Sequence, residues 1–357
     1  MLETRNLFID TQYFVKNNFD FSSTAFITLK SLCENEELKY FITSVVQQEV
    51  ESRIALSIKN ALNSLQSFKK KAQILSTIDN ALLAPLFSEF NEDELAEKVT
   101  DAFNKYNTDC KCEYIKATAI NPEMLLDLYF SKKPPFGEGK KKAEFPDAIS
   151  LLSLESHLGI NEKAYVISED NDLKTYCDAN HRLIFIDSLE KLLDIYNQHS
   201  NARTNKIKQY ITNNKEEIKT IISEYINSCD IYNNSTWEDS EVDSFIIDNI
   251  DDFDVNVIEV NNESCQLTFD AQINITVEVT GPNFENGFYD KEDGHIYTFS
   301  SITRIETIPL ELMCELELNY EFEDGELLNT DFGMLKIQNM KNGIEISVNE
   351  YPEPDWY

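Results

Sequence analysis

The spacing of hydrophobic residues changes part-way along this chain of 357 residues. In residues 1–198, short apolar runs alternate with stretches in which apolar residues recur at helical spacing. From about Val255 the period becomes two, most clearly between Leu267 and Val279. Buried strands that alternate with helices are typical of a parallel α/β sheet, whereas a period of two is typical of antiparallel strands with one wet face. We therefore predict an α/β domain over residues 1–198 and an α+β domain, rich in antiparallel strands, over residues 205–357.

The formal net charge of −33 is unevenly distributed between these two parts. Residues 1–200 contain 22 Lys and Arg against 31 Asp and Glu, whereas residues 201–357 contain 9 against 33. Because a strongly acidic surface repels nucleic acid, we expect the second domain to bind no polyanion by itself. Binding a protein partner, masking a basic groove and holding subunits together are the roles left open for this acidic domain.

Neither a membrane nor an oxidising compartment is indicated. No stretch approaches the roughly 18 apolar residues of a membrane span, and the first residues lack the features of a signal peptide. The seven cysteines form no ladder of spacings. We therefore expect a cytoplasmic protein with reduced thiols and no membrane contact.

Two acidic residues follow apolar runs of strand length. Asp10 ends the run from Leu7 to Ile9, and Asp170 follows the run from Tyr165 to Ser168. The carboxyl ends of parallel strands are where an α/β fold gathers its functional groups. Both side chains are therefore candidates for a site at this edge of the sheet.

Two further acidic residues lie near predicted helix starts. Glu49 falls in the first turns of a helix that begins near Ser44, where Ser44 and Gln47 resemble a capping box. Asp147 follows Pro146, which suits the first position of a helix.

Carboxylates gathered in one place repel one another unless a divalent cation lies between them. Hard cations such as Mg²⁺ prefer oxygen ligands, and the chain contains only four histidines. A metal-bound water is acidified and can attack a phosphodiester. We predict that Asp10, Glu49, Asp147 and Asp170 are catalytic and bind Mg²⁺ or Mn²⁺, with Asp172 sharing or replacing the role of Asp170.

The ordered motifs around these acids resemble those of the PIN domain. The motifs are Leu7-Phe8-Ile9-Asp10-Thr11, Ser44-Val45-Val46-x-x-Glu49-Val50, Glu144-Phe145-Pro146-Asp147-Ala148 and Val166-Ile167-Ser168-x-Asp170-x-Asp172. The third motif resembles a PIN-like subfamily with long helical insertions. The resemblance implies a Rossmann-like parallel sheet, an acidic pocket for one or two Mg²⁺ or Mn²⁺ ions, and nuclease activity, most often on RNA. Toxins and proteins of RNA decay or antiphage defence are among the relatives that it implies.

Several polar residues near the acids are candidates for contact with a substrate. They are Thr11, Ser168, Lys132, Lys133, Lys140, Lys141 and Lys142. The lysines flank a loop rich in Pro and Gly just before Asp147, where they could grip a phosphate backbone. Phe136 and Tyr13 could each stack on an unpaired base or pack in the core.

We therefore interpret the chain as a metal-dependent endoribonuclease, with RNA favoured over DNA as the nucleic-acid partner. A DNA nuclease of the flap or nicking type uses the same metal chemistry and is the alternative enzyme. A nuclease-dead module that binds nucleic acid or protein is the alternative without catalysis. Self-association into a homo-oligomer stays open.

Overall fold

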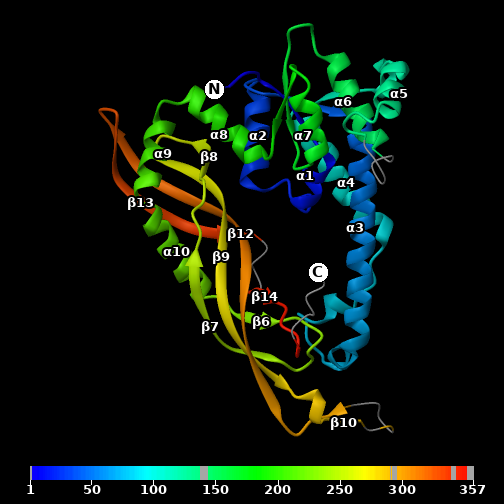
Figure 1. The fold of residues 1–357 in the computed structure, drawn as a ribbon, viewed down its shortest axis with the longest axis vertical. Coiled ribbons are helices and arrows are strands. Elements are labelled where there is room, and N and C mark those ends of the chain that lie inside the picture. The colour runs from blue at the N-terminus through cyan, green and yellow to red at the C-terminus, as the bar shows by residue number, and fades with distance from the viewer. Residues whose placement is uncertain (1, 137–143, 290, 292–295, 339–342, 352–357) are drawn as a thin grey trace. The chain divides into compact units, whose positions relative to one another are not determined.

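The computed structural model describes residues 2–136, 144–289, 291, 296–338 and 343–351 (Figure 1). Contacts between Cα atoms divide the chain into two compact units, Met1–His199 and Ser200–Tyr357. All seven cysteines are free thiols. Over the part of the chain that the structure describes, no helix combines the length and the apolar character that crossing a membrane requires.

The first unit is an α/β fold built on a parallel sheet. Its strands are β1 (Asn6–Ile9), β2 (Lys39–Thr43), β3 (Glu113–Ile115), β4 (Ala164–Ile167) and β5 (Leu183–Ile186). Its α-helices are α1 (Thr11–Lys16), α2 (Thr24–Glu34), α3 (Ser44–Lys71), α4 (Glu92–Asp109), α5 (Pro122–Phe130), α6 (Phe145–His157), α7 (Asn171–Asp178) and α8 (Leu189–Ser200). Short 3₁₀ turns, η1 (Gln73–Thr77), η2 (Ala84–Phe87) and η3 (Ala117–Ala119), lie in the connections.

The strand order in this sheet is β3-β2-β1-β4-β5, and every neighbouring pair is parallel. Leu7 in the central strand β1 aligns with Tyr40 of β2 and Tyr165 of β4. The chain builds outward from β1 in one direction and from β4 in the other, so the order reverses between these two strands. The predicted Rossmann-like parallel sheet is confirmed, and its switch point lies between β1 and β4.

The long helix α3 has its buried residues in its first half. Val46, Val50 and Ile54 are its buried residues, and they recur at helical spacing. The side chain of Thr43 accepts a hydrogen bond from the backbone N–H of Val46 at 3.2 Å. Thr43 is therefore the N-cap, and the predicted capping box with Ser44 as the cap is wrong, because the Ser44 hydroxyl instead accepts from the backbone N–H of Ala117.

The second unit combines two helices with long antiparallel strands. Its helices are α9 (Arg203–Asn213) and α10 (Lys215–Asn227), and a 3₁₀ turn, η5, covers Phe284–Asn286. Its strands are β6 (Ile231–Asn233), β7 (Glu241–Ile250), β8 (Asn256–Val260), β9 (Ser264–Pro282), β10 (Phe288–Tyr289), β11 (Ile296–Tyr297), β12 (Ser301–Glu323), β13 (Glu326–Ile337) and β14 (Ile344–Ile346). The main sheet has the order β13-β12-β9-β7, with β8 also paired to β9, and all of these pairs are antiparallel.

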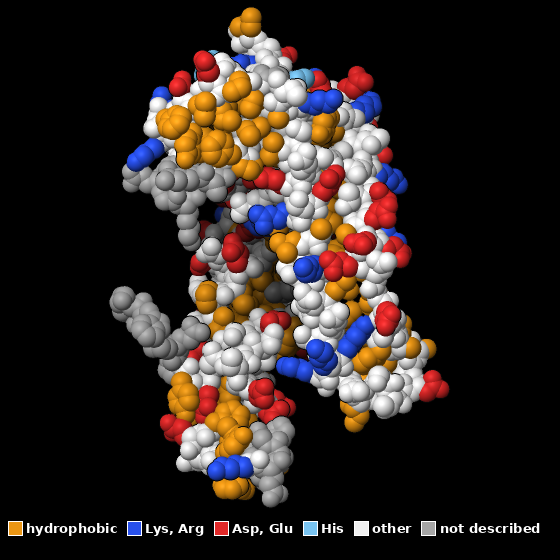
Figure 2. All heavy atoms as spheres, turned by 90° about the vertical axis from the view of Figure 1, so that its right-hand side faces the viewer, with side chains coloured by type: hydrophobic (Ala, Val, Ile, Leu, Met, Phe, Trp, Pro, Cys, Tyr) orange, Lys and Arg blue, Asp and Glu red, His pale blue; other side chains and the backbone are white. Residues whose placement is uncertain are grey.

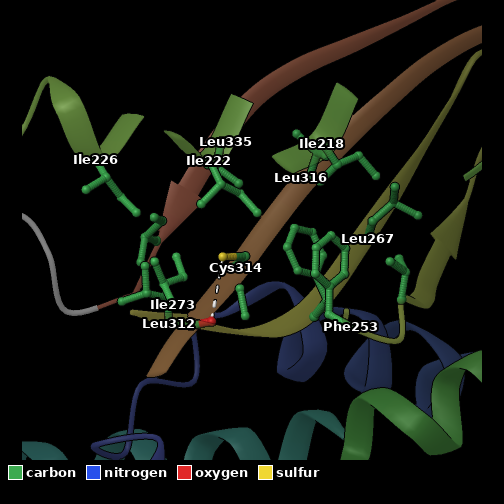
Figure 3. Close-up of a cluster of buried hydrophobic side chains, with 14 of the residues drawn as sticks. Ile218, Ile222, Ile226, Phe253, Leu267, Ile273, Leu312, Cys314, Leu316 and Leu335 are labelled. Atoms are coloured by element: carbon green, nitrogen blue, oxygen red, sulfur yellow. Dashed lines mark hydrogen bonds between the residues drawn. The ribbon is translucent and has the colours of Figure 1, made fainter. Parts of the chain in front are cut away.

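The core of the second unit lies between α10 and this sheet (Figure 3). Ile218, Ile222 and Ile226 recur every four residues on α10 and are fully buried. They cover the apolar face of the strands, where Leu267 and Leu316 are also fully buried. The alternation in the sequence predicted this buried face and the antiparallel pairing, and both are confirmed.

Candidate metal centre

The candidate site lies at the carboxyl ends of β1 and β4, the two strands at the switch point of the first unit. Asp10 follows β1 directly and is the N-cap of α1. Asp170 follows β4 and is the N-cap of α7, where its Oδ1 accepts from the backbone N–H of Asp172 at 2.6 Å. Helix capping fixes each carboxylate at the strand end, since the side chain satisfies a backbone donor that the helix leaves unpaired.

Asp10 is the most enclosed of the four predicted acids, with 8% of the residue exposed. Its Oδ2 accepts a hydrogen bond from Ser168 Oγ at 3.0 Å, and its Oδ1 accepts from the backbone N–H of Thr11 at 2.7 Å. Burial raises the pKa of Asp10 to about 6 against the lowering effect of these two bonds, and the charges of Glu49 and Asp170 add to the rise. The charges of two other predicted acids therefore act on the Asp10 carboxylate.

Glu49 reaches the site from the second turn of α3. Its Oε2 accepts from Thr11 Oγ1 at 2.9 Å, which ties α3 to the residue after Asp10. The hydroxyls of Thr43 and Ser150 lie 3.0 Å apart and join the start of α3 to α6, the helix that carries Asp147. Both of these residues are buried, so a polar contact inside the core links the first turns of the two helices.

Asp147 lies in the first turn of α6, with Pro146 before it as predicted. Burial is the main cause that raises its pKa to about 8, followed by a hydrogen bond with Glu144 and by the charges of Asp10 and Glu49. Glu144 is the N-cap residue of α6 and lies next to Asp147, and it was not among the acids predicted from the sequence. Its place three residues before Asp147, at a helix start, was the signal that could have identified it.

The donor set suits a hard divalent cation. Asp10, Glu49, Asp147, Asp170 and Glu144 offer carboxylate oxygens only, which is the chemistry that Mg²⁺ and Mn²⁺ select. Burial is the main cause that raises the pKa of Asp10 and Asp147, and repulsion from neighbouring acids adds to it; a bound cation would offset both effects. Among the described residues, no three His, Cys, Asp or Glu side chains are arranged as the ligands of a metal ion. The acids therefore influence one another's charge but do not yet form a complete set of metal ligands.

The predicted accessory residues have different places. Thr11 and Ser168 are buried, and their hydroxyls donate to Glu49 and Asp10, which orients these carboxylates. Ser168 Oγ also accepts from the backbone N–H of Asp170 at 3.1 Å. The contribution of Asp172 that the structure shows is its backbone N–H, which holds Asp170.

Only some of the lysines predicted to contact a substrate lie in the described part of the chain. Lys132 and Lys133 are exposed and follow α5, whereas Lys140, Lys141 and Lys142 lie outside the described residues. Phe136 and Tyr13 are each 4% exposed, and both therefore pack in the core, which was one of the two alternatives for them. The Tyr13 hydroxyl donates to Glu190.

Comparison with known families agrees with this geometry. Residues 7–173 match the family model described as PIN domain, a span that begins in β1 and ends in α7 and so includes all five carboxylates. Neither a search of curated proteins nor a search of solved structures gave a match. PIN domains have a nuclease-type fold and generally depend on divalent metal ions. The first unit of this chain is a PIN-like domain.

Proposed function

We propose that this PIN-like domain is a metal-dependent endoribonuclease that hydrolyses RNA phosphodiester bonds. The observation that carries the proposal is the group of acids at the switch point, where burial raises the pKa of Asp10 and Asp147 and the charge of Glu49 adds to both shifts. Carboxylates with perturbed pKa values in such a crevice are typical of catalytic sites. RNA is proposed ahead of DNA because PIN domains act most often on RNA.

Each residue has a distinct task in this proposal. Asp10, Glu49, Asp147 and Asp170 would hold Mg²⁺ or Mn²⁺, which when bound neutralises phosphate charge and acidifies a water molecule. Ser168 and Thr11 keep the carboxylates of Asp10 and Glu49 turned toward the site. Asp147 and Glu144 are hydrogen-bonded to each other, so one proton can be held between them beside the reacting phosphate.

The test is cleavage of labelled single-stranded and double-stranded RNA and DNA by the purified full chain. We expect cleavage of RNA with Mn²⁺ or Mg²⁺, none with a chelator, and a loss of at least about 100-fold in Asp10→Asn. Asp178→Asn, which changes an exposed acid at the end of α7, is the matched control and should cleave like the wild type. Full activity of Asp10→Asn would refute the assignment of the metal site. Selective cleavage of DNA would show that the protein is a DNA nuclease and not a ribonuclease.

The acidic second unit is proposed to act as an interaction or regulatory domain. Its negative charge disfavours direct contact with the substrate but allows it to compete with RNA for lysines of the first unit. A chain that ends before Ser200 should then cleave faster than the full chain under low salt. An unchanged rate would leave binding of a protein partner as the role to test next by affinity capture.

A regulated ribonuclease activity would be consistent with a role as a toxin or antiphage-defence effector. Expression of the wild-type chain should then slow growth or block phage replication, whereas Asp10→Asn should do neither. Equal growth and equal phage yield in the two strains would contradict this role without touching the nuclease assignment.

A further inference from the structure

Helix α5 is apolar but contains no buried residue. Met124 and Leu126 are each about half exposed, and Phe130 is 75% exposed. Figure 2 shows hydrophobic side chains gathered on the surface near its top, where Figure 1 places α5. A cluster of exposed apolar side chains often marks a binding surface.

The two sides of α5 differ. Leu125, Leu128 and Tyr129 are half-buried and recur at helical spacing, so this side faces the body of the first unit. Leu126 and Phe130 lie one turn apart on the outer side. The outer side therefore ends in an exposed aromatic ring at the last residue of the helix.

Ring contacts connect this aromatic residue to the candidate metal centre. The Phe130 and Tyr129 rings have centroids 5.3 Å apart, and the Tyr129 and Phe145 rings have centroids 5.1 Å apart. Phe145 is the first residue of α6, between Glu144 and Pro146 and two positions before Asp147. The buried ring of Phe136 packs against both Tyr129 and Phe145.

Charge differs between the two ends of α5. Glu123 and Asp127 lie in its first two turns, whereas Lys132 and Lys133 follow Phe130 after Ser131 and are exposed. A flat exposed ring next to lysines matches the two features of a nucleotide in a single strand, the face of its base and its phosphate. A base within a duplex has both faces stacked and cannot use such a ring.

We propose that Phe130 stacks on an unpaired base of the nucleic-acid strand that enters the carboxylate site. Phe130 is therefore a substrate-binding residue that contacts the single-stranded form and not a duplex. The inference rests on the proposed nuclease function for the position of the scissile phosphate. A protein partner is less favoured as the occupant, because ring contacts lead from Phe130 to the start of α6 and two exposed lysines follow it after Ser131.

The test uses single-stranded RNA oligonucleotides in which 2-aminopurine replaces one base at a time, with Mn²⁺, in an Asp10→Asn background that does not cut. Stacking on Phe130 should quench the fluorescence at one position, and adding Phe130→Ala should remove this quenching and weaken single-strand binding about 10-fold. Phe130→Trp should restore both signals. Duplex RNA should bind Phe130→Ala as it binds the parent.

Leu126→Ala is the matched control, since it removes an exposed apolar side chain one turn away on the acidic half of α5. Equal losses in Leu126→Ala and Phe130→Ala, or a change of oligomeric state in either, would overturn the proposal in favour of a protein interface. Single-strand binding unaffected by Phe130→Ala would also overturn it. Failure of the wild-type chain to cleave any nucleic acid with Mn²⁺ would refute the nuclease proposal, while the fluorescence comparison would still decide the role of Phe130.

Discussion

The first unit encloses a few acidic side chains at the ends of its strands, whereas the second unit places its many acids on the wet faces of its strands. Asp10 is 8% exposed, and burial raises its pKa to about 6. In β12, by contrast, Glu311 is exposed and the next residue, Leu312, is buried in the core. The charge of a carboxylate is costly only where water is removed and other carboxylates converge.

This difference shows why the number of acids does not identify a site. The second unit carries most of the net negative charge, yet the Asp252 carboxyl has its pKa lowered by a hydrogen bond from Lys219 and by the charge of that lysine. In the first unit, the pKa of Asp147 is raised by burial and by the charges of other acids. The direction of the shift, and not the density of charge, separates a solvated surface from a candidate metal centre.

The largest effect tests whether the two units are independent. Ile222→Ala removes a fully buried side chain of α10 and should destabilise the second unit by about 2–5 kcal/mol. Scanning calorimetry should show a shift of the transition of the second unit, with nuclease activity of the first unit unchanged. Thr220→Ala, an exposed position on the same helix, is the control. A single transition that moves as a whole would contradict independent units.

The next effect is the pH dependence of stability without metal. The pKa of Asp10 is raised from 3.8 to about 6 and that of Asp147 to about 8, so the folded state binds more protons than the unfolded state in this range. The free energy of unfolding should therefore fall as pH rises from about 4 to 8, by up to about 3 kcal/mol from Asp10.

The measurement is urea unfolding at several pH values with a chelator present. Asp10→Asn and Asp147→Asn should each be less pH-dependent than the wild type and more stable at pH 8. Saturating Mn²⁺ should remove the dependence in the wild type, since a cation offsets the repulsion. A wild-type chain that gains stability relative to these variants as the pH rises would contradict the buried repulsion.

A smaller effect is expected from the hydroxyl that orients Asp10. Ser168→Ala leaves Asp10 Oδ2 without its hydrogen-bond donor and should weaken Mn²⁺ binding about 10- to 100-fold. Ser153→Ala is a closely matched control, because Ser153 is equally buried but donates to the backbone carbonyl of Ile149. Titration calorimetry with Mn²⁺ separates the two variants, and equal affinities would show that Ser168 has no orienting role.

The smallest effect compares one acid from each unit. Glu144→Gln removes the negative charge beside Asp147 and places there an amide that can donate to its carboxylate, so the pH profile of cleavage should move to lower pH by about one unit. Glu311→Gln changes an exposed acid of β12 and should leave both the profile and, within about 0.5 kcal/mol, the stability unchanged. A shifted profile in Glu311→Gln would show that long-range charge, rather than local contact, sets the pH response.

The amino-acid sequence by itself determined the elements and the faces that they bury. The two periods of hydrophobic residues are local properties, so they gave the parallel sheet of the first unit and the alternating strand from Leu267 to Val279 in the second. Asp10 and Asp170 could be selected because an acid directly after a buried run has its position fixed by the strand that precedes it.

Only the tertiary structure decided which side chains meet and which lose water. Ser168 contacts Asp10 across a separation of 158 residues. Glu144 joins the site through its bond to Asp147, and Phe136 is buried while Phe130 remains exposed. A sequence pattern repeats over a few residues, whereas contact and desolvation depend on how distant segments pack together.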